Sequence, residues 1–189
     1  MDKLPEKMVS LEEIAQQLTQ HHAKYGEPSG LSLGKIGALL KKTAAVMFPQ
    51  YAVAEDDGLT LEERLGTLED AFYHIVEPLC KDKDVGCSRS LVQQFMAELP
   101  EIARLSHLDT EALIDGDPAA HSMEEVVLCY PGFFAVVAYR IAHQLYKRDV
   151  PLLPRMLTEY AHNRTGIDIH PSAQNSHSRF KDQGTGWLV

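Results

Sequence analysis

Helical periodicity that persists for most of the chain and then stops is the feature that most constrains its fold. The segment PGFFAVVAYRIAHQLYK, which starts at Pro131, has two adjacent apolar rows at helical spacing: Phe133, Val137, Ile141 and Leu145 form one, and Phe134, Ala138, Ala142 and Leu145 form the other. Proline is well tolerated as the first residue of a helix, because the N–H that it lacks has no helical partner there. A helix that is apolar over more than half of its surface is expected near the centre of a domain.

Capping signals divide the rest of the first 165 residues into further helices. Ser10 with Glu13, and Thr60 with Glu63, have the spacing of a capping box, in which each side chain accepts a hydrogen bond from the other residue's backbone N–H. Several other residues are expected to start or end helices: Ser32 and Ser122 as N-caps, Pro49 and Pro100 as boundaries, and Gly26 and Gly166 as C-terminal residues. The helix after Thr60 carries one apolar face made by Leu61, Leu65, Leu68 and Phe72. The sequence therefore predicts a mainly α fold, with a multi-helix domain at residues 1–165.

Composition excludes several classes of protein. Of the 189 residues, 44% are hydrophobic, which is enough to bury a core. The net charge of −9 disfavours binding to nucleic acid, and the longest apolar run, GFFAVVAY, is too short to span a bilayer. The first residues lack the apolar segment of a signal peptide. Three cysteines without a Cys-x-x-Cys pair indicate a reduced cytoplasmic protein, and the nine histidines lack the spacing of a metal site.

Residues 166–189 break the helical pattern. From Ile169 the chain divides into sixes, IHPSAQ, NSHSRF and KDQGTG, followed by WLV. One inward aliphatic residue in every six is the pattern of a left-handed parallel β-helix, whose stacked coils bury a common core. The inward positions would be Ile169, Asn175, Lys181 and Trp187, and burying an unpaired amide or ammonium is costly. Composition alone therefore favours an irregular C-terminal segment over a β-helix coil.

The stretch from Gly116 to Ala173 closely resembles serine O-acetyltransferases. The matching pieces occur in one order without a gap: DPAA, CYPGF, YRIAH, VPLLPR, TEYAH and TGIDIHP. That family has a helical N-terminal domain followed by a left-handed β-helix, so the resemblance implies that residues 166–189 are the remnant of the first hexapeptide coil. It also implies an acyltransferase that makes O-acetylserine from acetyl-CoA and L-serine, for cysteine biosynthesis. Acetyl-CoA would be a co-substrate, with no other cofactor bound.

The resemblance assigns roles to three aspartates and to the position of a general base. In the family, a His in a DHGTG-like motif is the general base that takes the proton from the serine hydroxyl. An Asp in the Asp-Ile-His-Pro motif orients that His, and it corresponds to Asp168. The Asp just before the base corresponds to Asp182, and the Asp of the DPAA motif to Asp117. Both are expected to line the site of the cationic substrate amine.

The chain departs from the family where the base is expected, because it reads DQGTG and places Gln183 there. An amide has no usable pKa for proton abstraction. The inward residues of the next hexads, Asn175 and Lys181, are also atypical, and Ser176 stands at a corner that the family gives to glycine. We expect a truncated or decayed chain of impaired activity; a frameshifted sequence would look the same. The acetyl-CoA-binding coils and the tail that docks into cysteine synthase are expected to be absent.

A second interpretation is a non-catalytic helical module that forms a homo-oligomer or co-assembles with a full-length relative. Tyr139, Arg140 and His143 lie at neighbouring turns of one expected helix. They could contact a substrate, but packing or subunit contact is the favoured role. His170 belongs to the family motif and is expected to line the site or to support it, and His177 is a weak alternative base.

Overall fold

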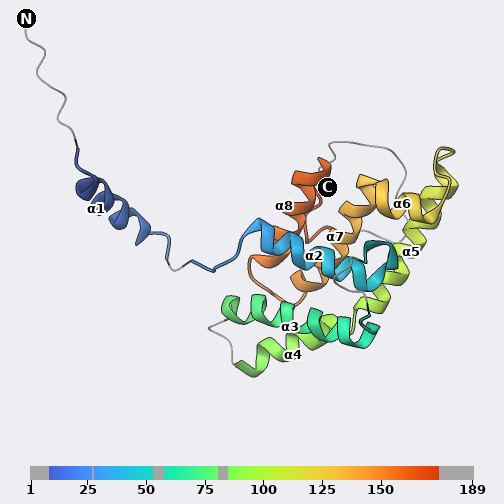
Figure 1. Cartoon of the computed structure of the whole chain (residues 1–189), viewed down its shortest axis with the longest axis horizontal. Helices are drawn as coiled ribbons and strands as arrows, with labels where there is room; N and C mark the ends of the chain where they lie inside the picture. The colour runs from blue at the N-terminus through green and yellow to red at the C-terminus, as the bar shows by residue number, and fades with distance from the viewer. Residues whose placement is uncertain (1–8, 27, 53–57, 81–84, 175–189) are drawn as a thin grey trace, which may run out of the picture. The chain divides into compact units, whose positions relative to one another are not determined.

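A computed structural model describes residues 9–26, 28–52, 58–80 and 85–174, and these residues are mainly helical (Figure 1). The elements, in chain order, are α1 (Leu11–His22), α2 (Leu33–Met47), the short 3-10 helix η1 (Pro49–Tyr51), α3 (Leu61–Leu79), α4 (Val85–Met96), α5 (Leu99–Gly116), α6 (Met123–Cys129), α7 (Pro131–Tyr146) and α8 (Leu153–Thr165). The chain divides into two compact units, residues 1–31 and 32–189. The mainly α fold predicted from the sequence is confirmed.

The first unit contains α1, which is held by its N-terminal cap. Ser10 Oγ accepts from the backbone N–H of Glu13 at 3.1 Å, and the Glu13 carboxylate accepts from the N–H of Ser10 at 3.0 Å. The capping box predicted from the sequence is therefore confirmed. The helix ends at His22, four residues before Gly26, and none of its residues is buried. The apolar face of α1 is exposed: Leu11 at 84%, Ile14 at 41% and Leu18 at 50%.

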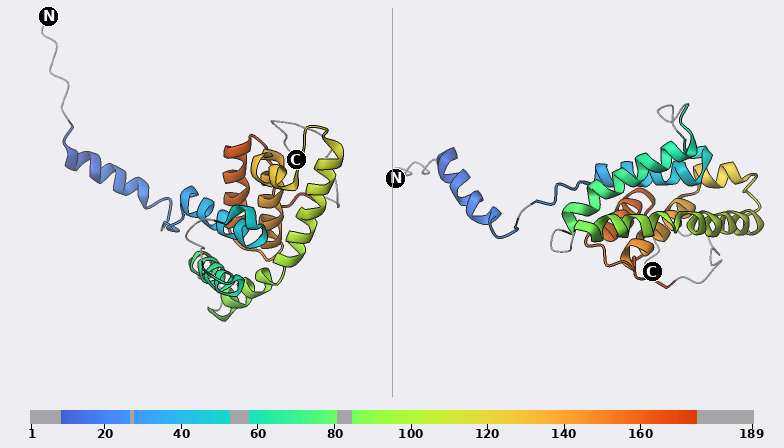
Figure 2. Two further views of the ribbon diagram at one scale, coloured as in Figure 1. Left: turned by 45° about the vertical axis from the view of Figure 1, so that its right-hand side comes forward. Right: turned by 90° about the horizontal axis from the view of Figure 1, so that it is seen from below.

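The second unit is built around α7 (Figures 1 and 2). Pro131 is its first residue, as predicted, and both apolar rows face the interior except at Phe134, which is half-buried. The fully buried side chains of this helix include Phe133, Ile141 and Leu145. Helix α8 lies against α7 after the turn at residues 147–152, α2 packs on α8, and α5 packs on α7. The prediction that the helix at residues 131–147 is central is confirmed.

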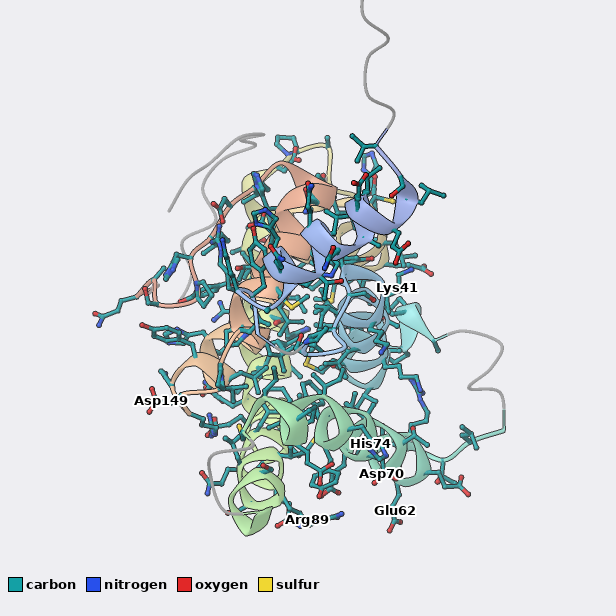
Figure 3. The ribbon with its side chains drawn as sticks, turned by 90° about the vertical axis from the view of Figure 1, so that its left-hand side faces the viewer. Lys41, Glu62, Asp70, His74, Arg89 and Asp149 are labelled. Carbon is teal, nitrogen blue, oxygen red and sulfur yellow. The ribbon has the colours of Figure 1, made fainter. Side chains whose placement is uncertain are left out.

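Helices α3 and α4 pack side by side and form one edge of this unit (Figure 2). Thr60 and Glu63 form the second predicted capping box at the start of α3. The inner face of α3 carries Leu68 and Phe72, both fully buried. Asp70 and His74 project from its outer side (Figure 3). An apolar inner face opposite a polar outer one is the pattern that docks a helix on a domain surface.

The remaining boundaries follow the same local chemistry. Ser32 and Ser122 cap α2 and α6 through the N–H groups of Lys35 and Glu125. Gly166 ends α8 with a left-handed φ of 73°, which a residue without a Cβ adopts at little cost. Pro100 was expected at a helix boundary, and it lies in the first turn of α5, where its missing N–H has no helical partner.

No strand occurs in the described ranges, although Asp168 makes a single β-bridge. The predicted start of a β-helix is therefore not visible in this part of the chain. The hexads from Asn175 onward, with Asp182 and Gln183, lie outside the described residues. The predicted domain boundary between residues 165 and 166 stays a prediction.

No single helix in the described ranges has the length and apolar character needed to cross a membrane. Helices α6 and α7 together have a suitable composition, but a bend of 75° separates them.

Contact between α2 and α8 depends on the absence of a side chain at Gly37. A Cβ built at this buried glycine would stand 2.4 Å from two ring atoms of Tyr160. We expect Gly37→Ala to lower the free energy of unfolding by about 1–3 kcal/mol, because the Tyr160 ring or the helix must move. Chemical denaturation measures the effect. Gly66→Ala is the matched control: Gly66 lies inside α3 with no atom within 4 Å of the added Cβ, so its helix propensity should make that variant neutral or more stable.

Candidate functional site

The segment after α8, residues 166–173, lies along α7. Ile167 and Ile169 are buried in a cluster with Ala135, Val136 and Tyr139 of α7. Alternate residues of the segment thus face the helix, and Asp168 between them is directed away from this apolar cluster. The Asp-Ile-His-Pro motif is therefore seated on the helical core rather than extending freely from it.

Asp168 has a fixed cationic neighbour. Its Oδ1 lies 3.2 Å from Nη1 of Arg155, in the first turn of α8. The other guanidinium nitrogen, Nη2, lies 3.0 Å from the Glu159 carboxylate. The Asp168 side chain is 16% exposed and Arg155 is 46% exposed, so the pair lies at the surface with the carboxylate the more sheltered partner. Arg155 therefore orients Asp168 while Glu159 steadies Arg155.

Asp117 lies between α5 and α6. Its Oδ1 accepts from the backbone N–H of Ala119 at 2.9 Å, and its Oδ2 accepts from the hydroxyl of Tyr130 at 2.8 Å. Tyr130 separates α6 from α7, so the carboxylate links the loop after α5 to the start of the central helix. The hydrogen bond to this carboxylate is the main cause that raises the pKa of Tyr130 above its usual value.

This hydrogen bond predicts a titration result. Because the pKa of Tyr130 is raised in the folded state, the stabilisation is complete below the usual tyrosine pKa and is lost as the pH rises through the raised value. Asp117→Asn should lower the pKa of Tyr130 toward the ordinary range, which ¹³C NMR of the tyrosine ring carbons can follow. Tyr130→Phe identifies the resonance. An unchanged Tyr130 pKa in Asp117→Asn would show that the carboxylate is not its partner in solution.

A second group of polar side chains surrounds the end of α7. An open hollow of about 950 Å³ lies beside the α7–α8 turn, where Asp149 is exposed (Figure 3). Its lining residues include His143, Tyr146, Lys147 and Ser172. Across the described ranges, no group of three or more His, Cys, Asp or Glu side chains has a geometry suited to a metal ion. His170 makes a local hydrogen bond beside this hollow: its Nδ1 lies 2.6 Å from Oγ of Ser172, which lines the hollow.

Of the four positions assigned from the family motifs, the structure describes only Asp117 and Asp168. Asp117 and Asp168 are held by different partners, Tyr130 in one case and Arg155 in the other. Their joint role at one site stays a prediction. Asp182 and Gln183 lie outside the described residues.

Sequence reasoning did not single out Arg155 and Tyr130, although both lie in quoted pieces of the family resemblance, VPLLPR and CYPGF. Arg155 could have been found as the cation four residues before Glu159, the spacing of an ion pair on one helical face. Nothing in the local sequence links Tyr130 to Asp117, because that contact depends on how α6 and α7 meet.

Comparisons with known proteins match the helical part of the chain. A family model described as "Serine acetyltransferase, N-terminal" matches residues 64–138. The chain is 48% identical over 99 residues to a plasmid-borne serine acetyltransferase of Synechococcus elongatus, covering 52% of this chain and 31% of the relative. It is 42% identical over 86 residues to serine acetyltransferase of Bacillus subtilis, covering 46% of this chain and 40% of that one. The chain thus spans about a third of the length of these relatives.

The fold comparison agrees with the sequence matches. The crystal structure of Entamoeba histolytica serine acetyltransferase 1 in complex with L-cysteine superposes with a TM-score of 0.60 and 28% identity, covering 84% of this chain and 60% of that one. All of these relatives are acetyltransferases, and the family model assigns the matched helices to an N-terminal domain. The helical part of this chain is therefore similar to the N-terminal domain of serine acetyltransferases.

Proposed function

We propose that this chain carries the helical domain and part of the catalytic site of a serine O-acetyltransferase, which transfers the acetyl group of acetyl-CoA to L-serine. The observation that supports this most is the Asp-Ile-His-Pro segment, which packs on α7 with Asp168 paired to Arg155, in a chain that is 48% identical over 99 residues to a serine acetyltransferase. The solved relative with bound L-cysteine, a close analogue of serine, supports an amino-acid substrate.

The proposed chemistry is a direct transfer. A base removes the serine hydroxyl proton, the alkoxide oxygen attacks the thioester carbonyl, and CoA leaves as the thiol. Asp168 would orient the base, and Asp117 would bind the substrate ammonium together with Asp182. A carboxylate already held by Arg155 costs little reorganisation when the base docks against it.

Gln183 stands at the position where the family resemblance expects the general base. Its side-chain amide can hold a hydroxyl by hydrogen bonding, but it cannot take the proton. We therefore propose that turnover by this chain is low. The test is serine-dependent release of CoA thiol from acetyl-CoA by the purified protein, with free thiol measured against a no-serine control. Rapid turnover would refute the role given to position 183, and binding of neither serine nor acetyl-CoA by calorimetry would refute the proposed function of the chain itself.

A second candidate function is assembly without catalysis, and the exposed apolar face of α1 favours it. Leu11, Ile14 and Leu18 lie on one side of a helix that has no buried residue. The apolar rows of α7 are largely buried within the chain. We propose that a second copy covers the α1 face. Light scattering at micromolar concentration should show an oligomer that the double variant Ile14→Glu with Leu18→Glu dissociates; a strictly monomeric wild-type protein excludes this function.

A further inference from the structure

Two side chains of α7 reach the segment that carries Asp168. The hydroxyl of Tyr139 donates to the backbone carbonyl of Ala173 at 2.5 Å. Nδ1 of His143 lies 2.7 Å from the carbonyl oxygen of Pro171. A carbonyl oxygen only accepts, so His143 carries its proton on Nδ1 in this arrangement. Each contact joins the central helix to residues about 30 positions later in the chain.

These contacts add to the apolar packing of the same segment against α7. Ile167 and Ile169 fix its first half against α7, and the bonds from Tyr139 and His143 fix its second half. The rings of Tyr139 and His143 also contact each other, with centroids 5.4 Å apart. Because successive residues of an extended segment point to opposite sides, a slip of one residue would turn Asp168 toward the helix. The two polar contacts are made to the carbonyl oxygens of particular residues, Pro171 and Ala173. They therefore fix the register of the segment on α7, which apolar packing alone would not do.

We propose that Tyr139 and His143 are positioning residues: they hold residues 171–173 in one register on α7 and thereby fix the orientation of the Asp168 carboxylate beside Arg155. The inference rests on the proposed function for the catalytic importance of Asp168, while the register itself is a property of the helical domain. The structure supports it through two carbonyl contacts, at Pro171 and Ala173, that lie C-terminal to Asp168 and add to the packing of Ile167 and Ile169.

Amide hydrogen exchange of the full chain tests the register. The N–H groups of Ile167 and Ala173 are reporters, since they donate to Thr165 Oγ1 at 3.1 Å and to the carbonyl of His170 at 2.9 Å. Tyr139→Phe keeps the ring and removes the hydroxyl, and it should raise exchange at Ala173 roughly fivefold, the effect of losing about one hydrogen bond. Helices α7 and α8 should keep their protection. Tyr146→Phe is the matched control, because Tyr146 lies on the same helix with 46% exposure.

His143 allows a rescue experiment. His143→Leu should raise exchange at Ala173 in the same way, whereas His143→Asn, whose amide N–H lies near the position of Nδ1, should restore most of the protection. Unchanged exchange in both Tyr139→Phe and His143→Leu would overturn the proposal. Equal loss of protection in α7, α8 and the segment would also overturn it, since the two residues would then act only on global stability.

Catalytic measurements separate this inference from the proposed function. If the chain releases CoA in a serine-dependent manner, Tyr139→Phe should lower kcat and leave KM for acetyl-CoA unchanged. If the wild-type chain has no activity but the exchange results hold, the positioning of the segment stands and the transferase function fails. If activity is present and insensitive to both variants, the positioning role fails and the transferase function stands.

Discussion

Replacing Asp109 by alanine is expected to destabilise the helical core by about 3–5 kcal/mol, because it leaves the buried guanidinium of Arg140 without its counter-charge. Asp109 is on α5 and Arg140 is on α7, and their side chains are 3% and 12% exposed. Both Nε and Nη2 of Arg140 donate to the same carboxylate oxygen, at 2.9 Å and 2.6 Å. Urea denaturation followed by circular dichroism measures the loss.

Two comparisons isolate the cause of that loss. Glu101→Ala removes an ion pair with Arg104 on the same helix α5, but these side chains are 47% and 54% exposed, so solvent screens the pair and the denaturation midpoint should barely move. The double variant Asp109→Leu with Arg140→Met removes both charges and keeps apolar volume. It should recover most of the stability lost in Asp109→Ala. If the double variant is as unstable as Asp109→Ala, an unpaired charge is not the cause.

Local sequence signals predicted most helix boundaries correctly, because capping is local chemistry. Ser10 with Glu13, Thr60 with Glu63, and Gly166 each act within four residues, and the structure shows each in its expected role. The end of α1 was predicted four residues too late. Gly26 does adopt a left-handed φ of 72°, but the helix stops earlier, at His22. None of its residues is buried, so α1 lacks the packing that would stabilise a further turn.

Contacts between distant segments were not predictable in the same way. The apolar rows showed that α7 is central, but they did not show that Arg140 on this helix pairs with Asp109. The sequence placed Tyr139 and His143 on neighbouring turns and favoured packing. It could not show that both reach the carbonyls of residues 171–173, since that depends on the path of the chain after α8. The family resemblance predicts that Asp117 and Asp168 are site residues, and this stays a prediction, whereas their partners Tyr130 and Arg155 came only from the structure.

Phe72→Ala is expected to cost about 3–5 kcal/mol and to loosen α4 from α3, because the ring is fully buried and the truncation leaves a cavity. Its neighbour is Phe95 of α4, also fully buried, with ring centroids 4.5 Å apart. Thermal and urea denaturation measure the stability, and amide exchange in α4 locates the damage. The loss of protection in α3 and α4 should exceed the loss in α7, since the cavity lies between α3 and α4.

Leu61→Ala is the control that separates burial from hydrophobicity, because the sequence placed Leu61 on the same apolar face of α3 as Phe72. Leu61 is 56% exposed at the start of the helix, so its truncation should change stability by no more than about 0.5 kcal/mol. Combining Phe72→Ala with Phe95→Ala then tests whether the two rings act together. Contacting aromatic residues should be coupled, so the double variant should lose less than the two single losses added together. Strict additivity would mean that the rings are not in contact in solution and that α3 and α4 pack through other side chains.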